Sequence, residues 1–230
     1  MFDLFGVAAR RFARPAYGPV DPVHPGWPES TPQVCLPDGT RVRLRPLLRR
    51  DGEDWSQLRI LDEERLRPVE PTVNGSWALA HSATQWWSYL SGMRDAALGG
   101  TVVPLVIEVD GHFGGQVTLG GIQHGAASEC WIGYWVYSGL WGRGIATAAC
   151  ALGVDHAVDR VGLHRVTATY LDSNPASGAV LAHNGFEQEG YLRANLHIDG
   201  RWQDHYFVAR LAGPFPGSCV ADLREQGRVR

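Results

Sequence analysis

A glycine-rich segment stands directly before an alanine-rich one in GLWGRGIATAA, residues 139–149. A helix N-terminus presents unpaired N–H groups and the positive end of the helix dipole, and glycines before it leave that backbone accessible. A segment of this composition is expected to bind an anion, and phosphate is the obvious ligand.

Two common phosphate-binding motifs do not match this segment. A P-loop ends in Gly-Lys-Ser/Thr, whereas the segment has Gly-Ile-Ala-Thr and contains no lysine. A dinucleotide-binding fingerprint requires a third glycine where Thr147 stands and an acidic residue after the next strand. A third type of phosphate loop has to be considered.

Residues 141–146, WGRGIA, resemble the pyrophosphate loop of the Gcn5-related N-acetyltransferases (GNAT), which is written Arg/Gln-x-x-Gly-x-Gly/Ala. The chain departs from this pattern at the first position, where Trp141 replaces Arg or Gln. The departure itself is similar to YWGKGYAT in the Rim-type ribosomal-protein N-acetyltransferases. The position of the loop agrees with the family, because ECWIGYWV, a predicted strand, stands before it and a predicted helix follows.

Other segments carry the same resemblance. IGYWV, at residues 132–136, resembles the Rim-type IGYWL, and LRPVEPT resembles LRPWEP with valine in place of tryptophan. Asn174, Ser177 and a later Gly-Phe reproduce N-x-x-S…GF, and WQDHYFVARL is similar to the family's last strand. The resemblance covers roughly residues 40–211 and implies acetyl transfer from acetyl-CoA to an amine, without a metal.

The resemblance implies a cofactor site at the loop and the strand before it. In the family this strand separates from its neighbour, so Val136 is the expected main-chain partner of the pantetheine arm and Trp135 a wall. Asn174, which with Ser173 is one of two candidates for the N-cap of the following helix, is assigned to the same site. The pyrophosphate is expected to contact the backbone amides of Gly142, Arg143, Gly144 and Ala146, together with Thr147.

Two hydroxyl groups are candidates for the proton steps. Many family members protonate the leaving thiolate with a tyrosine, but the matching position here is Leu181. The Rim-type resemblance implies Ser177 instead, with the alternative that Ser177 only satisfies a backbone amide in its helical turn. Because a free thiol has a pKa of about 8.5, a weak donor is sufficient. Tyr134 is expected to act as a relay.

Two carboxylates are candidates for contact with the amine. Glu129, at the start of the central strand, is the expected base through a water molecule, and an ordinary exposed strand end is the alternative. Glu70, between two prolines, is expected to orient the substrate ammonium. Neutralising an α-amine at pH 7 costs roughly 1 kcal/mol, against about 4 to 5 kcal/mol for lysine. A site with such modest bases suits a protein N-terminus better than a lysine.

The identity of the acceptor has alternatives. The Rim-type resemblance implies the N-terminal residue of a ribosomal protein, with alanine or serine first. The same scaffold acetylates small amines such as aminoglycosides, polyamines or amino acids, and the acids Asp62, Glu63, Glu64 and Glu70 would suit a polycation. A non-catalytic acyl-CoA sensor is a third reading, and Ser177 and the complete loop count against it.

These residues depend on a predicted succession of one strand, two helices, three strands, a helix, a strand, a helix and two strands. Asp110-Gly111 and Asp199-Gly200 predict hairpin turns, and a tryptophan-bearing helix over residues 77–98 is expected to pack in the core. The order predicts an α+β fold. The resemblance specifies a three-layer α/β/α GNAT fold with a mixed, mostly antiparallel central sheet of about seven strands.

Composition divides the chain into three segments. Residues 1–39 form a proline-rich N-terminal extension that is expected to be an arm without a core, and residues 40–211 form the acetyltransferase domain. Residues 212–230 are expected to be a loose tail.

Charge and cysteine content narrow the partners. The 230 residues carry a formal net charge of −3, so no global field attracts nucleic acid or anionic lipid. The four cysteines form no CxxC pair or His/Cys cluster, which argues against a metal site or a disulfide framework. No segment is long enough to span a bilayer, so we expect a cytoplasmic protein without membrane contact. We also expect a monomer or homodimer that does not contact nucleic acid directly.

Overall fold

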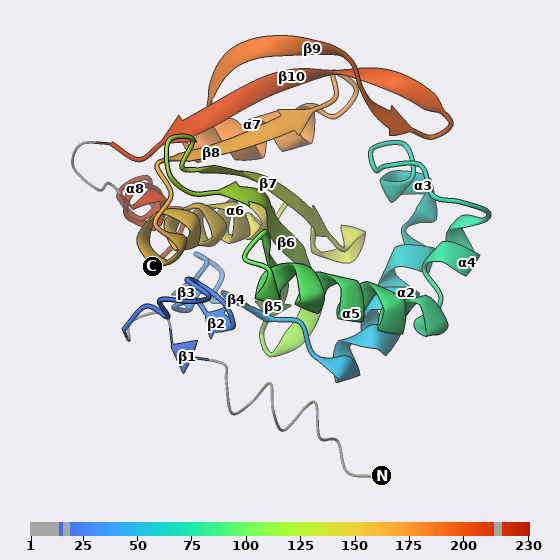
Figure 1. The fold of residues 1–230 in the computed structure, drawn as a ribbon, viewed down its shortest axis with the longest axis horizontal. Helices are drawn as coiled ribbons and strands as arrows, with labels where there is room; N and C mark the ends of the chain where they lie inside the picture. Colours follow the sequence, from blue (N-terminus) through green and yellow to red (C-terminus); the bar gives the residue numbers. More distant parts are fainter. Residues whose placement is uncertain (1–13, 16–18, 214–217) are drawn as a thin grey trace.

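A mixed sheet forms the middle layer of the molecule (Figure 1). The computed structural model describes residues 14–15, 19–213 and 218–230. Within them, eight strands have the order β3-β4-β5-β6-β7-β8-β10-β9, and all neighbours are antiparallel except β7 and β8. The strands are β3 (Val34–Cys35), β4 (Arg41–Pro46), β5 (Val102–Val109), β6 (His112–Gln123), β7 (Glu129–Val136), β8 (Arg165–Tyr170), β9 (Glu187–Ile198) and β10 (Arg201–Leu211).

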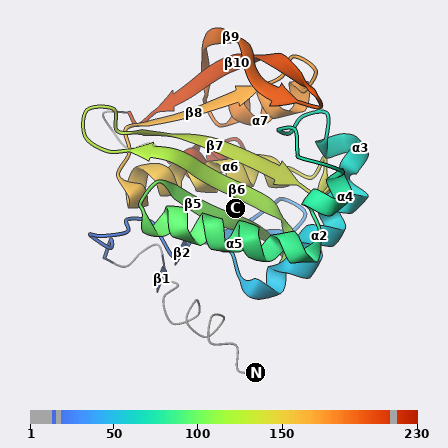
Figure 2. The same cartoon turned by 45° about the vertical axis from the view of Figure 1, so that its right-hand side comes forward.

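Helices cover both faces of this sheet (Figure 2). On one face lie α6, α7 and α8, and on the other α2, α3, α4 and α5. The helices are α2 (Gly52–Leu61), α3 (Glu63–Leu66), α4 (Trp77–Ala80), α5 (Ala83–Leu98), α6 (Ile145–His156), α7 (Pro175–His183) and α8 (Cys219–Glu225), with short helical turns η1 (Arg49–Asp51), η2 (Ser138–Leu140) and the π-helical η3 (Ala157–Val161). This arrangement confirms the three-layer fold.

The sheet has eight strands where about seven are expected. The additional strand is β3, which comes from the proline-rich segment and pairs with β4. A separate parallel pair joins β1 (Arg14–Pro15) to β2 (Glu29–Ser30). Such short strands have no periodicity of their own in the sequence, because their stability comes from their neighbours.

Both predicted hairpin turns are present. Asp110 and Gly111 have φ of 50° and 89°, and Asp199 and Gly200 have φ of 44° and 80°. Two successive positive φ values match the twist of the flanking strands and favour Asp-Gly. The predicted helix over residues 77–98 is interrupted, since Ser82 is the N-cap of α5 and accepts a hydrogen bond from the N–H of Gln85.

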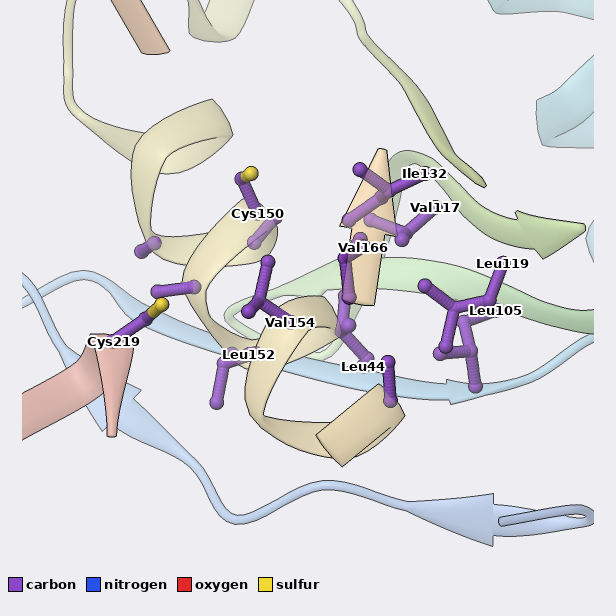
Figure 3. Close-up of a cluster of buried hydrophobic side chains, with 14 of the residues drawn as sticks. Leu44, Leu105, Val117, Leu119, Ile132, Cys150, Leu152, Val154, Val166 and Cys219 are labelled. Carbon is purple, nitrogen blue, oxygen red and sulfur yellow. The ribbon is translucent and has the colours of Figure 1, made fainter. Parts of the chain in front are cut away.

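Small residues bring α6 close to the sheet in the larger of two core clusters (Figure 3). Ala149 and Cys150 are fully buried. A Cβ on Gly153 would lie 2.9 Å from Cδ1 of Ile132, so glycine is required for this helix–strand distance. The second cluster, on the other face, is aromatic and includes Trp55, Trp77, Trp86, Phe113 and Trp135.

The described parts of both terminal segments belong to the same core, contrary to expectation. Val34 and Leu36, from the proline-rich segment, are 1% exposed in the larger cluster. In the expected loose tail, α8 packs against α6, and Leu223 is fully buried. The backbone of Arg230 also pairs with that of Cys35. Residues 1–13, 16–18 and 214–217 lie outside the described residues.

Candidate active site

The only parallel pair of strands in the described sheet separates along its length. β7 pairs with β8 from Glu129 to Trp131, and the pairing does not continue toward Val136. Tyr137 donates its N–H to the carbonyl of Gly114 on β6, so alternate residues 132, 134 and 136 direct their backbone groups toward the β8 side. β7 therefore offers a free backbone edge in its second half.

The glycine segment follows this free edge. Gly142 and Gly144 have φ of 73° and 82°, and a Cβ on either would meet no atom within 4 Å. Gly144 is the N-cap of α6, and the first helical hydrogen bond runs from the N–H of Ala148 to its carbonyl. The amides of residues 142–147 have no acceptor among the described residues. They form an open cradle at the positive end of a helix.

Two side chains of the loop contact neighbouring backbone and side chains. Trp141 is 53% exposed and donates its indole N–H to the carbonyl of Val136 at 2.7 Å. Arg143 donates to Asp38 at 3.2 Å and to the hydroxyl of Thr40 at 2.5 Å. Arg143 thus lies beside the cradle, held by the turn that leads into β4.

Two hydroxyl groups meet between β7 and α7. The phenol of Tyr134 lies 3.1 Å from Oγ of Ser177 and 3.3 Å from its carbonyl oxygen. Asn174 is the N-cap of α7 and accepts the N–H of Ser177 at 3.2 Å, which fixes the turn that carries the serine. Burial raises the pKa of Tyr134, so its phenol stays protonated at neutral pH. Leu181 is 1% exposed and packs in the core.

The opposite face of β7 carries Trp135, whose indole N–H donates to Oε1 of Gln116 at 3.0 Å. Gln116 also accepts from the indole of Trp55 and donates to the hydroxyl of Tyr89. Arg59 of α2 lies over the ring of Trp135, 4.7 Å from its centroid. The Trp135 ring is therefore held in place on the face of β7 opposite to the Tyr134–Ser177 hydroxyl pair.

Glu70 is bound to Arg59. The two guanidinium nitrogens lie 2.5 and 3.0 Å from its carboxylate oxygens, and the Glu70 side chain is 20% exposed. Burial raises the pKa of Glu70, an effect that the charge of Arg59 opposes. The carboxylate lies at the edge of the aromatic cluster, with part of its surface accessible.

The structure does not bring Glu129 to the hydroxyl pair. Glu129 precedes Tyr134 by five residues, roughly 17 Å along a strand, and alternates onto the opposite face. Its carboxylate lies 3.5 Å from Arg165, which also binds Glu189. This placement matches the alternative of an exposed strand end.

Comparison with known proteins identifies the family. Residues 41–187 match the family model described as an acetyltransferase (GNAT) domain. The chain belongs to the GNAT acetyltransferase family. RimJ of Mycobacterium smegmatis, solved in complex with CoA-disulfide, is 46% identical to this acetyltransferase, with a TM-score of 0.87. That likeness covers 90% of this chain and 99% of the other.

Two further relatives agree with this family. The [ribosomal protein uS5]-alanine N-acetyltransferase of Escherichia coli is 29% identical over 80% of this acetyltransferase and 94% of that protein. The ribosomal-protein-S5-alanine acetyltransferase of Vibrio fischeri has a TM-score of 0.69 at 23% identity, covering 76% of this chain and 96% of that one. The latter likeness supports the fold.

Three of the four acids that would suit a polycationic acceptor are engaged within the acetyltransferase. Asp62 is fully buried and accepts two hydrogen bonds from Ser138. Glu63 lies 3.6 Å from Arg67, and Glu70 binds Arg59, whereas Glu64 is exposed. The three engaged carboxylates are compensated by neighbours, so they do not form an open acidic cleft.

The described residues lack both a metal-binding cluster and a membrane-spanning helix. In residues 14–15, 19–213 and 218–230, no group of three or more His, Cys, Asp or Glu side chains has a metal-binding arrangement. Within the same residues, no helix combines the length and the apolar character needed to cross a membrane.

Sequence reasoning missed the supporting roles of three polar residues, and it identified Asp62 only as an acid that would suit a polycation. Arg59, Asp62 and Gln116 have partners 11 to 76 residues away, so no local motif marks them. Gln116 did carry a signal, because it is a polar residue among the apolar residues and glycines that occupy the buried positions of β6. Its amide is required by the two indole N–H groups that face it.

Proposed function

We propose that this acetyltransferase transfers the acetyl group of acetyl-CoA to the N-terminal α-amine of a protein, a ribosomal protein that begins with alanine or serine. The observation that carries the proposal is the alignment of three features along one path. The open amide cradle at residues 142–147 leads to the free edge of β7, and that edge leads to the Tyr134–Ser177 hydroxyl pair.

The path fits the chemical groups of acetyl-CoA in order. The cradle offers N–H donors and the helix dipole to a pyrophosphate, and both glycines lack side chains that would obstruct it. The free backbone groups of Tyr134 and the N–H of Val136 suit the amides of a pantetheine arm, whereas the carbonyl of Val136 already accepts the indole N–H of Trp141. Trp141 and Arg143 flank this path, where Arg143 adds positive charge.

Stabilisation of the departing sulfur falls to the hydroxyl pair. Acetyl-CoA, when bound, supplies a thioester carbon that the amine attacks with loss of the C–S bond. Ser177 donates a hydrogen bond to the departing sulfur, and Tyr134 donates to Oγ of Ser177 in turn. The surplus proton of the amine leaves to water. Because a thiol has a pKa of about 8.5, the sulfur needs little acid assistance.

An α-amine suits this site because, among the described residues, no carboxylate hydrogen-bonds to either hydroxyl of the pair. With a pKa near 8, roughly one α-amine in ten is neutral at pH 7, whereas a lysine with pKa near 10.4 is neutral in fewer than one case in about two thousand. Glu70, with its remaining exposed surface, orients the incoming amine. The name of the Escherichia coli relative supports a ribosomal-protein acceptor. A cytoplasmic reaction is part of the same proposal.

Intact-mass detection of acetyl transfer tests the proposal. Two matched peptides are offered with acetyl-CoA, one with a free N-terminal alanine and one N-blocked with an internal lysine, and an aminoglycoside is offered separately. Modification of the free N-terminus alone supports the proposal. Modification of the aminoglycoside alone would assign the enzyme to small-molecule acetylation, and CoA binding without transfer would favour a sensor.

A further inference from the structure

Asp62 joins the acceptor-side helices to the turn before the phosphate-binding loop. It is fully buried at the junction of α2 and α3, and its backbone carbonyl accepts the N–H groups of Arg65 and Leu66. Its carboxylate accepts the N–H of Ser138 on Oδ2 and the hydroxyl of Ser138 on Oδ1, both at 2.6 Å. Both oxygens of a buried charge are thus committed to one residue.

Ser138 is the point where the free edge of β7 turns toward the cradle. It begins η2, and its carbonyl accepts the N–H of Trp141 at 3.1 Å. Trp141 in turn binds the carbonyl of Val136 and is followed directly by Gly142. Any rotation of Ser138 would therefore move both the end of the strand edge and the start of the cradle.

A second contact between α2 and β7 lies one helical turn earlier. Arg59, three residues before Asp62, lies 4.7 Å from the ring centroid of Trp135 and binds Glu70. The last turn of α2 therefore contacts the cofactor strand at Trp135 and its following turn at Ser138. The charged group nearest to the Asp62 carboxylate is Arg65 at 4.0 Å, which is half-exposed. Two short hydrogen bonds from Ser138 are the main compensation for the buried charge.

We propose that Asp62 is a positioning residue for CoA binding, which acts through Ser138 to hold the phosphate-binding loop in line with the free edge of β7. The inference rests on the proposed function, because it takes acetyl-CoA as the ligand of this path. Asp62 itself contacts neither the cradle nor the hydroxyl pair. A purely structural role would affect folding stability, whereas this role affects the affinity for CoA.

Isothermal titration of the full-length protein with CoA tests the role. Asp62→Asn leaves one acceptor for two donors, and we expect it to weaken CoA binding by about tenfold or more. KM for acetyl-CoA should rise by a similar factor while kcat at saturation changes by less than about threefold. Ser138→Ala keeps the backbone donor and should lose about threefold in affinity, and Ser138→Thr, which restores the hydroxyl, should recover it.

Glu29→Gln is the matched control for stability. Glu29 is also fully buried, and it binds Arg160 of η3 at 2.7 and 2.9 Å, at the far end of α6 from the cradle. The Glu29→Gln substitution should lower the melting temperature without changing the dissociation constant for CoA.

The outcomes separate this inference from the proposed function. Wild-type affinity for CoA in folded Ser138→Ala and Asp62→Asn would overturn the positioning role alone. If Asp62→Asn does not fold, equal CoA affinity of the alanine and threonine variants of Ser138 would overturn it. A wild-type protein that binds no CoA would overturn both the inference and the proposed function.

Discussion

The chemistry of the site concentrates in two neutral hydroxyl groups. Ser177 could be expected from its place in the N-x-x-S pattern and Tyr134 as a relay, and the structure brings their hydroxyl groups to 3.1 Å. Of the two possible N-caps, Asn174 and Ser173, the structure uses Asn174, which holds Ser177 in place through its backbone N–H. The expected base, Glu129, is not at this site, because it lies beside Arg165 at the other end of β7. Which end of a strand faces a site depends on where neighbouring strands separate, and that is a tertiary property.

Replacement of Ser177 separates chemistry from binding. Ser177→Ala is expected to lower kcat by about 100-fold, because the departing sulfur loses its hydrogen-bond donor. The dissociation constant for CoA should change by less than about threefold, since the cradle is untouched. Tyr134→Phe should give a smaller loss of kcat, as it removes only the partner of Ser177. Steady-state kinetics with titration of CoA measure both. Equal loss of affinity and turnover would reduce Ser177 to a helix-turn residue.

Gly144 tests the anion cradle with two variants of nearly equal shape. Asn and Asp both tolerate a left-handed conformation such as the φ of 82° at this position, and a Cβ there has open space. Gly144→Asn should therefore fold and bind CoA with a loss of about tenfold. Gly144→Asp adds a negative charge beside the pyrophosphate and should lose at least about tenfold more. Equal affinities of the two variants would contradict an anion at this position.

At the scale of elements, local patterns predict the long strands and their turns, because alternation and Asp-Gly act within a few residues. The break between α4 and α5 was missed. The helix is interrupted there, and His81 lies between Trp55 and Trp77, with ring centroids 5.4 and 4.0 Å away. The interruption is stabilised by tertiary contacts of His81 with these aromatic rings and with Arg59. The helical periodicity of the sequence does not encode such contacts.

His81 makes this helical junction sensitive to acid. Burial, and secondarily the charge of Arg59, lower its pKa from 6.5 to about 4. Below pH 6.5 the unfolded chain therefore binds a proton at His81 that the folded chain does not bind until about pH 4. Folding stability therefore decreases as the pH is lowered through this window. The contribution is about 2.5 kcal/mol between pH 7 and pH 4.5.

His81→Gln removes this titration and should reduce the acid loss of stability by that amount. Urea unfolding of both proteins at pH 7 and at pH 4.5 measures the difference of differences, so that other titrating groups cancel. Parallel losses in the wild type and the variant would show that His81 is protonated equally in the folded and unfolded chains.

At the scale of the whole molecule, the ends of the domain were misjudged for a common reason. β3 and α8 are too short to form patterns, and each is held by residues far away in the chain. Asp155 of α6 accepts the N–H groups of Cys219 and Val220 at 2.6 and 3.1 Å, and the backbone of Arg230 pairs with Cys35. The Asp155 contacts connect α8 to α6, whose N-terminus forms the cradle, and the Arg230–Cys35 pair connects the residues after α8 to β3.

Two leucine-to-alanine substitutions measure how much α8 contributes. Leu223 is fully buried in the core, whereas Leu211, at the end of β10, is 49% exposed. Leu223→Ala should lower the free energy of unfolding by about 2 to 5 kcal/mol through lost burial and a residual cavity. Leu211→Ala should cost less than about 1 kcal/mol. Denaturant unfolding of both variants gives the comparison. Because α8 packs against α6, Leu223→Ala should also weaken CoA binding at temperatures near the melting temperature of the variant. Equal stability of the two variants would contradict a contribution of α8 to the fold.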